Sequence, residues 1–415
     1  MRESESALTG RQALALFLVF AVGYFFSSLM RGVIATLAPE LTREFDLNAG
    51  QLGLLAGGYF IGFAVFQLPL GYWLDRHGPR KVLAGFLVLA VVSSAGFAAA
   101  QGFVALLIAR VLGGIGVCAC LMAALTAYRR WFPPAFQHRG NAWMLMVGSL
   151  GQLSATLPVQ WAVPLVGWRL VFALVGLAFA LVIVLVLWRV PREQEPSPAT
   201  AAAGFNLWTA YQPVLANWTF RRLAPVGLVK YGSVTALQTL WVGPWLTEVT
   251  GATPLAAASG LFAVNLTMLA VFWMWGAVTP RLAERGITAE GLLLAGLPVG
   301  SLFLAWIAWL GSASTWVHWC VFFAVSSFNA LMLPIIGMVF PAAQAGRALS
   351  ALNLTFFLGT FIWQWVIGLG IDALLNGGLA RAEAMRVMVA LVVVCDLLAY
   401  AWYALNRHRT GVVPA

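Results

Sequence analysis

Apolar runs of about 20 to 26 residues recur twelve times along this chain of 415 residues, with short polar turns between them. A helix needs about 20 apolar residues to cross the ~30 Å hydrocarbon core of a bilayer, so each run is long enough to span a membrane. Only 9% of the residues are charged, against about 25% in soluble domains. A soluble enzyme, a nucleic-acid-binding module and a disulfide scaffold are therefore excluded. The runs predict transmembrane helices at about residues 13–37, 50–74, 81–100, 103–128, 141–164, 169–189, 223–246, 255–279, 289–310, 316–340, 348–371 and 386–405.

The predicted spans form two groups of six, separated by the only long polar connection in the sequence. This connection begins with PREQEPSPATAAAG, whose Pro and charged residues do not suit a hydrocarbon interior. It continues into a stretch that fits a short interfacial helix. We therefore predict an N-terminal six-helix bundle over 1–189, a cytoplasmic central linker over 190–222, and a C-terminal six-helix bundle over 223–415 that ends in a short cytoplasmic tail.

The two halves echo each other when the first is shifted by 205 positions. The shift aligns Ser28 with Ser233, Pro39 with Pro244, Leu41 with Leu246, Thr42 with Thr247, Gly71 with Gly276 and Arg76 with Arg281. Chance matches among common residues are the alternative explanation. A duplicated unit predicts an all-α polytopic membrane protein with two pseudo-symmetric bundles and a substrate site near the midplane between them.

The basic residues give the expected orientation. The formal net charge is +10, but the 24 Lys and Arg are scattered between apolar runs and form no single basic stripe. If the N-terminus is cytoplasmic, the outer ends and loops hold only Arg43, Arg169, Arg381 and Arg386, and most other basic residues lie inside. Basic residues accumulate in cytoplasmic loops, so we expect both termini to be cytoplasmic and the chain to lie in the bacterial inner membrane.

The segment GYWLDRHGPRK, residues 71–81, is the most specific motif in the sequence. Gly71 would permit close helix contact, Asp75 places an acid at a cytoplasmic helix end, and Gly78 with Pro79 makes a turn. Three basic residues hold the loop inside: Arg76, Arg80 and Lys81. The segment closely resembles the signature loop of the major facilitator superfamily. That resemblance implies that the acid and the basic residues latch the two halves together on the cytoplasmic side in the outward-facing state.

A second match lies in LLIARVLGGIGV, where Arg110 occupies the place of the arginine in the fourth-helix motif of that superfamily. A lone arginine in a membrane costs several kcal/mol unless it is hydrated or paired, so we expect a structural or state-switching role for it. The resemblance covers essentially the whole chain. One departure is the stretch GSLGQLSATLP, which does not reproduce the fifth-span Gly-Pro motif of proton-coupled drug exporters.

Polar residues repeat at helical spacing on spans one, five, seven and eleven, which are cavity-lining helices in the superfamily. Polar groups are costly in hydrocarbon and are expected to face the protein interior. Ordinary interhelical hydrogen bonding is the alternative role for the Ser, Thr, Asn and Gln residues. The candidate substrate-binding residues are Tyr24, Ser28, Arg31, Gln152, Thr156, Lys230, Gln238, Trp241, Asn353, Thr360 and Gln364. The gating candidates are Gly71, Asp75, Arg76, Gly78, Arg80, Lys81 and Arg110.

Two cations favour an anionic substrate. Arg31 and Lys230 lie within predicted spans, where acids are scarce, so an electropositive cavity is expected if both face it. The alternative for each is snorkelling of the long side chain toward an interface. Asp396 is the clear intramembrane acid, for which we expect structural pairing, with proton relay as the alternative. Asp372 lies at the outer end of span eleven.

These features predict a secondary active transporter, not an enzyme, that moves a small polar, anionic organic solute by rocker-switch alternating access. The alternative is a proton-coupled exporter of amphipathic drugs, with a wall formed by Trp241, Trp245, Trp273, Trp275, Trp363 and Trp365, although lipid-facing anchoring also explains such residues. A membrane receptor or assembly factor that does not transport is a third hypothesis. We expect a monomer that binds its solute, membrane lipid, and a proton or counter-anion as coupling ion. We expect no metal, cofactor or nucleic acid, and the sequence has no Gly-Lys-Ser/Thr loop for ATP.

Overall fold

The computed structural model describes residues 10–132, 134–192 and 207–407, and within these ranges every regular element is helical. Helices suit a bilayer because each backbone N–H and C=O finds its partner inside its own segment. Nine helices in the described ranges are long and apolar enough to cross a membrane. Helical stretches at 49–65, 134–154 and 218–249 occupy the other predicted spans, and the count of twelve stays a prediction. Residues 193–206 of the predicted linker lie outside the described residues.

The chain divides into two compact units whose limits do not follow the predicted bundles. The first unit comprises residues up to 33 together with 61–206, and the second comprises 34–60 together with the chain from 207 onward. The C-terminal end of span one and the N-terminal end of span two therefore pack as part of the second unit.

Helix α1 (Gly10–Phe45) runs eight residues past the predicted end of span one at residue 37. The prediction covered the apolar run alone. Proline cannot donate a hydrogen bond to the carbonyl four residues earlier. In the structure Pro39 lies inside the helix. Pro39 therefore leaves the Ala35 carbonyl without its helical hydrogen bond. The backbone of Gly243 packs close to this carbonyl, since a Cβ atom built on Gly243 would lie 2.9 Å from the Ala35 oxygen.

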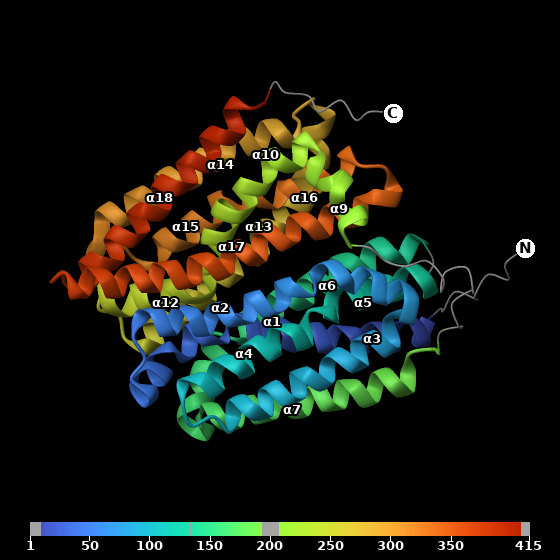
Figure 1. Ribbon diagram of the computed structural model, residues 1–415, viewed down its shortest axis with the longest axis horizontal. Helices are drawn as coiled ribbons and strands as arrows, with labels where there is room; N and C mark the ends of the chain where they lie inside the picture. The colour runs from blue at the N-terminus through green and yellow to red at the C-terminus, as the bar shows by residue number, and fades with distance from the viewer. Residues whose placement is uncertain (1–9, 133, 193–206, 408–415) are drawn as a thin grey trace, which may run out of the picture. The chain divides into compact units, whose positions relative to one another are not determined.

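The first unit is built around α3 (Gln67–Ala98), which packs along α4 (Phe103–Val117) and α7 (Leu157–Arg189), as Figure 1 shows. The unit also contains α5 (Ala119–Trp131), α6 (Pro134–Ser154) and the part of α1 before residue 34. Both α3 and α7 contain one non-helical residue, Gly78 and Gly167, each with φ of 75°. These glycines separate spans two from three and five from six, because residues with a Cβ atom rarely adopt a positive φ.

Span seven is divided between α-helical and π-helical turns. It runs through α10 (Trp218–Val226), η1 (Gly227–Tyr231), α11 (Gly232–Ala236), η2 (Leu237–Trp241), α12 (Val242–Pro244) and η3 (Trp245–Val249). It follows the short helix α9 (Leu207–Ala216), which lies where the interfacial helix was predicted. π-Helical turns are rare and occur frequently at functional sites.

The rest of the second unit consists of long helices that pack against span seven and against each other. They are α13 (Pro254–Glu284), α14 (Ala289–Leu310), η4 (Gly311–Ala313), α15 (Trp316–Ser326), η5 (Ser327–Leu331), α16 (Met332–Val339), α17 (Ala342–Asn376) and α18 (Arg381–Leu405). Helix α18 lies along α14 (Figure 1). Helix α2 (Ala49–Val65) begins in this unit and packs against α17 through glycines described below.

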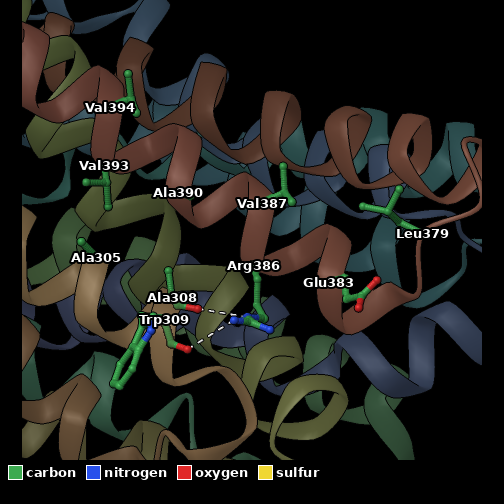
Figure 2. A pocket seen from close by; sticks show the side chains of 10 residues that line it. All are labelled: Ala305, Ala308, Trp309, Leu379, Glu383, Arg386, Val387, Ala390, Val393 and Val394. Carbon is green, nitrogen blue, oxygen red and sulfur yellow. Dashed lines mark hydrogen bonds between the residues drawn. The ribbon is translucent and has the colours of Figure 1, made fainter.

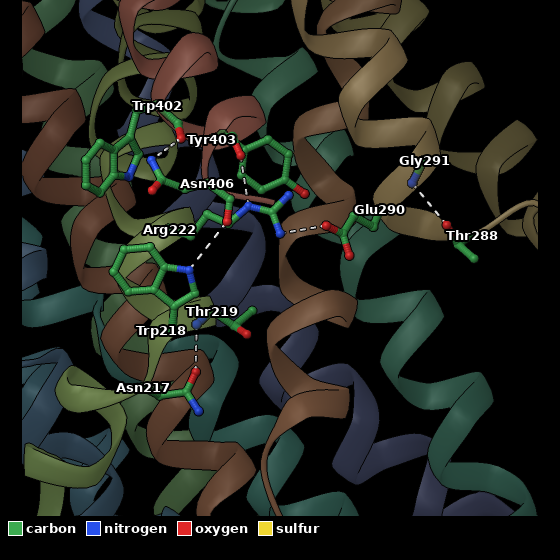
Figure 3. A network of polar contacts seen from close by, with 10 residues as sticks. All are labelled: Asn217, Trp218, Thr219, Arg222, Thr288, Glu290, Gly291, Trp402, Tyr403 and Asn406. Atoms are coloured by element: carbon green, nitrogen blue, oxygen red, sulfur yellow. Dashed lines mark hydrogen bonds and ion pairs between the residues drawn. The ribbon is translucent and has the colours of Figure 1, made fainter. Parts of the chain in front are cut away.

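A network around Arg222 fixes the start of span seven (Figure 3). The Arg222 side chain ion-pairs with Glu290 of α14 at 2.6 Å, and its Nε donates to the Tyr403 carbonyl of α18 at 2.9 Å. The guanidinium also lies 4.0 Å from the centroid of the Tyr403 ring. One buried cation thus ties three helices of the second unit together at the end where span seven begins.

Candidate functional site

The polar stripe predicted on span one faces α6 within the first unit. Two glycines of α6 allow a close approach, because a Cβ atom at Gly148 would collide with the Tyr24 ring and one at Gly151 would lie 3.0 Å from the Ser28 Cβ. Tyr24 and Ser28 are both buried. Spans one and five therefore meet at the predicted residues, with backbones close enough for both helices to line one face.

Arg31 lies deep in α1 beside this contact. The helix continues from residue 31 to residue 45, about 21 Å at 1.5 Å per residue, so Arg31 does not sit at the end of its helix. The end of the helix does not mark the edge of a bilayer, because α1 continues through the polar residues Glu40, Arg43 and Glu44, so snorkelling stays the alternative role for Arg31. Its half-buried guanidinium lies 5.8 Å from the centroid of the Phe63 ring. The next residue, Gly32, lies against Gln152 of α6, since a Cβ atom built on Gly32 would lie 2.9 Å from the Gln152 Oε1.

Two other candidates of the first unit engage backbone carbonyls. Thr156 lies at the break between α6 and α7, and its buried hydroxyl donates to the Leu153 carbonyl at 2.6 Å. Arg110 of α4 is 1% exposed, and its Nη1 donates to the Met30 carbonyl at 2.9 Å. Arg110 thus holds the α1 backbone one residue before Arg31, which fits the structural role expected for it.

Lys230 and Asp396 form a buried ion pair inside the second unit. The Lys230 Nζ lies 2.8 Å from the Asp396 Oδ2 and also donates to the Ser301 hydroxyl at 2.8 Å. The other carboxylate oxygen, Oδ1, accepts from the Ser233 hydroxyl at 3.0 Å. The side chains of Lys230 and Asp396 are 2% and 0% exposed. Spans seven, nine and twelve are therefore joined by one fully buried polar cluster.

This cluster bears on two expectations. An electropositive cavity was expected if Arg31 and Lys230 both face it, and in this conformation Lys230 pairs with Asp396. The structural pairing expected for Asp396 is confirmed. The sequence did not identify the partner, because the two residues are 166 positions apart.

Spans seven and eleven meet at Gln364. Its Nε2 donates to the Thr239 hydroxyl at 2.9 Å and to the Ala236 carbonyl at 3.3 Å, so this amide bridges the two helices. Among the described residues, neither the Gln364 Oε1 nor the indole Nε1 of Trp241 has a hydrogen-bond partner, although both atoms are buried. Buried polar groups in native structures normally have partners, so these two atoms are candidates for contact with a ligand or water.

The remaining candidates of the second unit have ordinary helix-bundle contacts. The Gln238 Nε2 donates to the Asn265 Oδ1 of α13 at 3.2 Å, and the Thr360 hydroxyl donates to the Phe356 carbonyl of its own helix at 2.8 Å. Asn353 is half-buried on α17. Sequence reasoning missed Thr239, although it adjoins Gln238, and it missed Asn265 because no stripe of polar residues marks span eight.

The signature loop forms the predicted turn. Gly78 has φ of 75° and ψ of 162°, and Pro79 follows it. Asp75 is exposed, and the Arg130 Nη2 donates to the backbone carbonyls of Leu74 and Asp75 at 3.2 and 3.4 Å. Arg130, at the end of α5, thus holds the backbone next to the acid, while the carboxylate itself stays at the surface.

The other residues of the loop have separate contacts within the first unit. The Arg76 Nη1 donates to the Tyr72 hydroxyl, Arg80 donates to the Leu187 carbonyl, and Lys81 is exposed. The close helix contact expected at Gly71 is absent from this conformation, since no described atom lies within 4 Å of a Cβ atom built there.

A carboxylate from span eleven caps the beginning of α2. Asp372 accepts hydrogen bonds from the backbone N–H groups of Ala49 at 3.0 Å and Gly50 at 2.7 Å. The first N–H groups of a helix have no partner within the helix, and an acid there also interacts favourably with the helix dipole. The sequence placed Asp372 correctly at the end of span eleven but assigned it no partner.

Glycines of α2 bring its backbone onto α17 below this cap. A Cβ atom at Gly53 would collide with the Gln364 carbonyl, and one at Gly57 would lie 3.0 Å from the Phe361 ring. Gly50, Gly53 and Gly57 have the three- and four-residue spacing that places them on one helix face. This spacing is the signal in the sequence that predicts the contact.

Comparison with known proteins gives the family. A family model described as the major facilitator superfamily matches residues 20–410. A crystal structure of a bacterial homologue of the human lysosomal transporter Spinster, inward-facing and unoccupied, superimposes with a TM-score of 0.77 over 96% of this chain and 97% of that one at 20% identity. The crystal structure of a D-xylose–proton symporter gives a TM-score of 0.74 at 16% identity, with 94% and 97% of the two chains covered.

Curated relatives are transporters. The chain is 29% identical over 169 residues to a hexuronate transporter of Escherichia coli (strain K12), covering 40% of this chain and 39% of that protein. It is 28% identical to a galacturonate transporter of Dickeya chrysanthemi, covering 42% and 51%. A gallate transporter of Pseudomonas putida is 24% identical, with 95% and 90% covered. The first two matches thus span about half or less of those relatives. Because the family model covers nearly the whole chain, this protein belongs to the major facilitator superfamily.

Proposed function

We propose that this protein transports a small organic anion across the bacterial inner membrane by rocker-switch alternating access. The observation that carries the proposal is the position of Arg31, a half-buried cation within the apolar part of α1, beside the close contact between α1 and α6. A cation held inside a membrane is costly, and an anionic substrate offsets that cost through charge-assisted hydrogen bonds. The relatives named for hexuronate, galacturonate and gallate support an anion.

We assign the primary anion contact to Arg31 and not to Lys230. Lys230 already has a carboxylate partner at 2.8 Å, so a substrate could use its charge only after Asp396 released it. In the first unit, Tyr24, Ser28, Gln152 and Thr156 are the proposed companions of Arg31. In the second unit, the proposed substrate contacts are Gln238, Trp241, Asn353, Thr360 and Gln364, of which Trp241 and Gln364 have buried polar atoms without a described partner.

The drug-exporter alternative is not favoured. The six tryptophans that this alternative invokes have different environments. Trp245 is 1% exposed and its indole N–H donates to the Ser314 hydroxyl, whereas Trp273 is 77% exposed. Trp275 donates to the Ser327 hydroxyl. A promiscuous wall requires these rings to share one surface, and their burial argues against it.

Ligand binding to the purified transporter tests the proposal. Thermal shift with galacturonate, gallate and a lipophilic cation should show stabilisation by the carboxylates, because a ligand that binds the folded state raises its stability. Arg31→Gln should weaken carboxylate binding at least tenfold, about 1.4 kcal/mol. Arg43→Gln is the matched control, since Arg43 is an exposed cation near the end of the same helix. Stabilisation by the lipophilic cation alone, or equal affinity in Arg31→Gln, would contradict the proposal.

We also propose that the signature loop gates transport, with Asp75, Arg76, Arg80 and Lys81 latching the cytoplasmic side when the outer side is open. Asp75→Asn should impair transport without impairing membrane insertion, because it removes the latch charge and leaves the binding residues intact. Labelling of single cysteines from the periplasmic side should fall as the population shifts. Full activity with unchanged labelling would remove Asp75 from the gate.

A further inference from the structure

A groove of about 640 Å³ lies between α14 and α18 at the end of the second unit where α18 begins (Figure 2). Small side chains form much of its wall, with Ala305 and Ala308 on α14 and Ala390, Val393 and Val394 on α18. The groove exists because alanines stand where larger residues would fill the space between the two helices.

The groove opens toward the lipid. Trp309, Val387 and Val394 line it and are 74%, 44% and 53% exposed on the outside of the protein. Both helices are long and apolar enough to span a membrane, so these exposed apolar residues face hydrocarbon. Water does not fill an apolar groove at this depth, and an acyl chain is the apolar material available there.

Two opposite charges stand at the rim of the groove. Arg386 lies near the start of α18 and is held at the end of α14, where its Nε donates to the Ala308 carbonyl at 3.0 Å and its Nη2 to the Trp309 carbonyl at 3.2 Å. A guanidinium has five N–H donors, so these two bonds leave donors for a ligand. Glu383 lies one helical turn earlier, also lines the groove, and forms no ion pair among the residues that the structure describes. Figure 2 shows the two side chains apart, with dashed lines only from Arg386 to carbonyls of α14.

The length of the groove matches one leaflet. From Arg386 to Val394 the helix rises eight residues, about 12 Å, and half of the hydrocarbon core is about 15 Å. The charged rim therefore lies near the headgroup level, with the apolar wall extending most of the way to the middle of the bilayer.

We propose that this groove binds one phospholipid whose headgroup carries both a phosphate and a primary ammonium, as in phosphatidylethanolamine. The phosphate contacts the Arg386 guanidinium, the ammonium donates to the Glu383 carboxylate, and one acyl chain lies against Ala305, Ala308 and Ala390. An anionic glycerol headgroup gives Glu383 no cationic partner. A choline headgroup has no N–H to donate. With the predicted orientation, this lipid belongs to the outer leaflet.

Native mass spectrometry of the delipidated full-length protein tests the site. Titration with phosphatidylethanolamine, phosphatidylcholine and phosphatidylglycerol of equal chain length should show one site that prefers phosphatidylethanolamine at least fivefold. Glu383→Gln should abolish the preference over phosphatidylcholine. Arg381→Gln should keep it, since Arg381 lies in the same first turn but pairs with Glu248 at 2.6 Å.

A steric pair of variants tests the acyl chain separately. Ala390→Phe fills the groove and should remove the site, whereas Leu391→Phe should retain it, because Leu391 is 42% exposed on the same helix but does not line the groove. Soluble phosphoethanolamine without acyl chains should not compete. Equal binding of all three lipids, or unchanged binding in both Glu383→Gln and Ala390→Phe, would overturn the proposal. Thermal unfolding of each variant verifies that it remains folded.

Discussion

Arg31 in the first unit and Lys230 in the second are both cations inside spans, but their surroundings differ. Lys230 is 2% exposed and has a carboxylate at 2.8 Å and two serine hydroxyls within the same cluster. Arg31 is half-buried, next to a close contact between α1 and α6, with its guanidinium over the Phe63 ring. The residue type and the span alone therefore do not identify an anion site.

The difference has an energetic basis. Removing one partner of a buried ion pair strongly destabilises the fold, because the other partner is left as an uncompensated buried charge. Such a pair contributes to the integrity of the bundle. A partly exposed cation can exchange its contacts with a ligand at a lower cost. We therefore expect substitutions at the two sites to change different quantities. Substitution at the Lys230 pair should change the stability of the protein, and substitution of Arg31 should change its affinity for the ligand.

The largest effect is expected from removal of Asp396. Asp396→Leu should destabilise the protein by about 3–5 kcal/mol, because Lys230 stays buried without its acid. The double variant Lys230→Met/Asp396→Leu should recover most of this loss, since no charge remains to be compensated. Unfolding in detergent gives both values. Glu284→Gln is the control, because Glu284 is an exposed acid at the end of α13. If the single and double variants are equally unstable, the ion pair is not the source of the effect.

Loss of one hydroxyl from the same cluster should have a smaller effect. Ser233→Ala removes the donor to the Asp396 Oδ1 and should cost about 1.5–3 kcal/mol, the range for hydrogen bonds to charged groups. Ser259→Ala is matched to it, since that exposed hydroxyl bonds only to the Leu255 carbonyl of its own helix. Equal unfolding midpoints for the two variants would show that Ser233 does not support the carboxylate.

Substrate affinity sharpens the contrast between the two cations. The Lys230→Met/Asp396→Leu double variant should bind a carboxylate substrate within about threefold of the parent protein, or about 0.7 kcal/mol, because Arg31 remains. Equilibrium binding with the same ligand used for Arg31→Gln measures this. A tenfold loss in the double variant would return Lys230 to the substrate site.

The smallest effect is expected at the exposed pair between Arg381 and Glu248, whose side chains are 41% and 31% exposed. Glu248→Gln should change stability by less than about 1 kcal/mol, since solvent and salt screen such pairs. The unfolding midpoint measured at low and high salt checks this. A loss as large as that in Asp396→Leu would show that burial does not separate the two ion pairs.

Local features were predictable from the sequence. The turn at Gly78 was predicted, because a Gly-Pro pair in a basic loop between apolar runs favours a turn. The helical fold was also predicted, because the apolar runs are long enough to span a membrane as helices. The end of α1 was not predicted, because the apolar run that defines span one stops before the polar residues Glu40, Arg43 and Glu44, and the helix continues through them.

Pairings between distant residues were beyond the sequence. Asp396 was expected to be paired, but its partner depends on how spans seven and twelve lie together. The same is true of Asp372 on α2, which is separated from Gly50 by 322 residues. The π-helical turns of span seven were also missed, since they carry no composition that distinguishes them from α-helix.

The distance between Lys230 and Asp396 along the chain also has a consequence for biosynthesis. The ribosome makes Asp396 166 residues after Lys230, a delay of roughly 8–33 s at about 5–20 residues per second. During that interval span seven enters the bilayer with a lysine whose acid does not yet exist, at a cost of several kcal/mol. The nascent second half therefore cannot complete its interior until the last span is inserted. A chain that terminates before residue 396 therefore keeps Lys230 inside the bilayer without its acid.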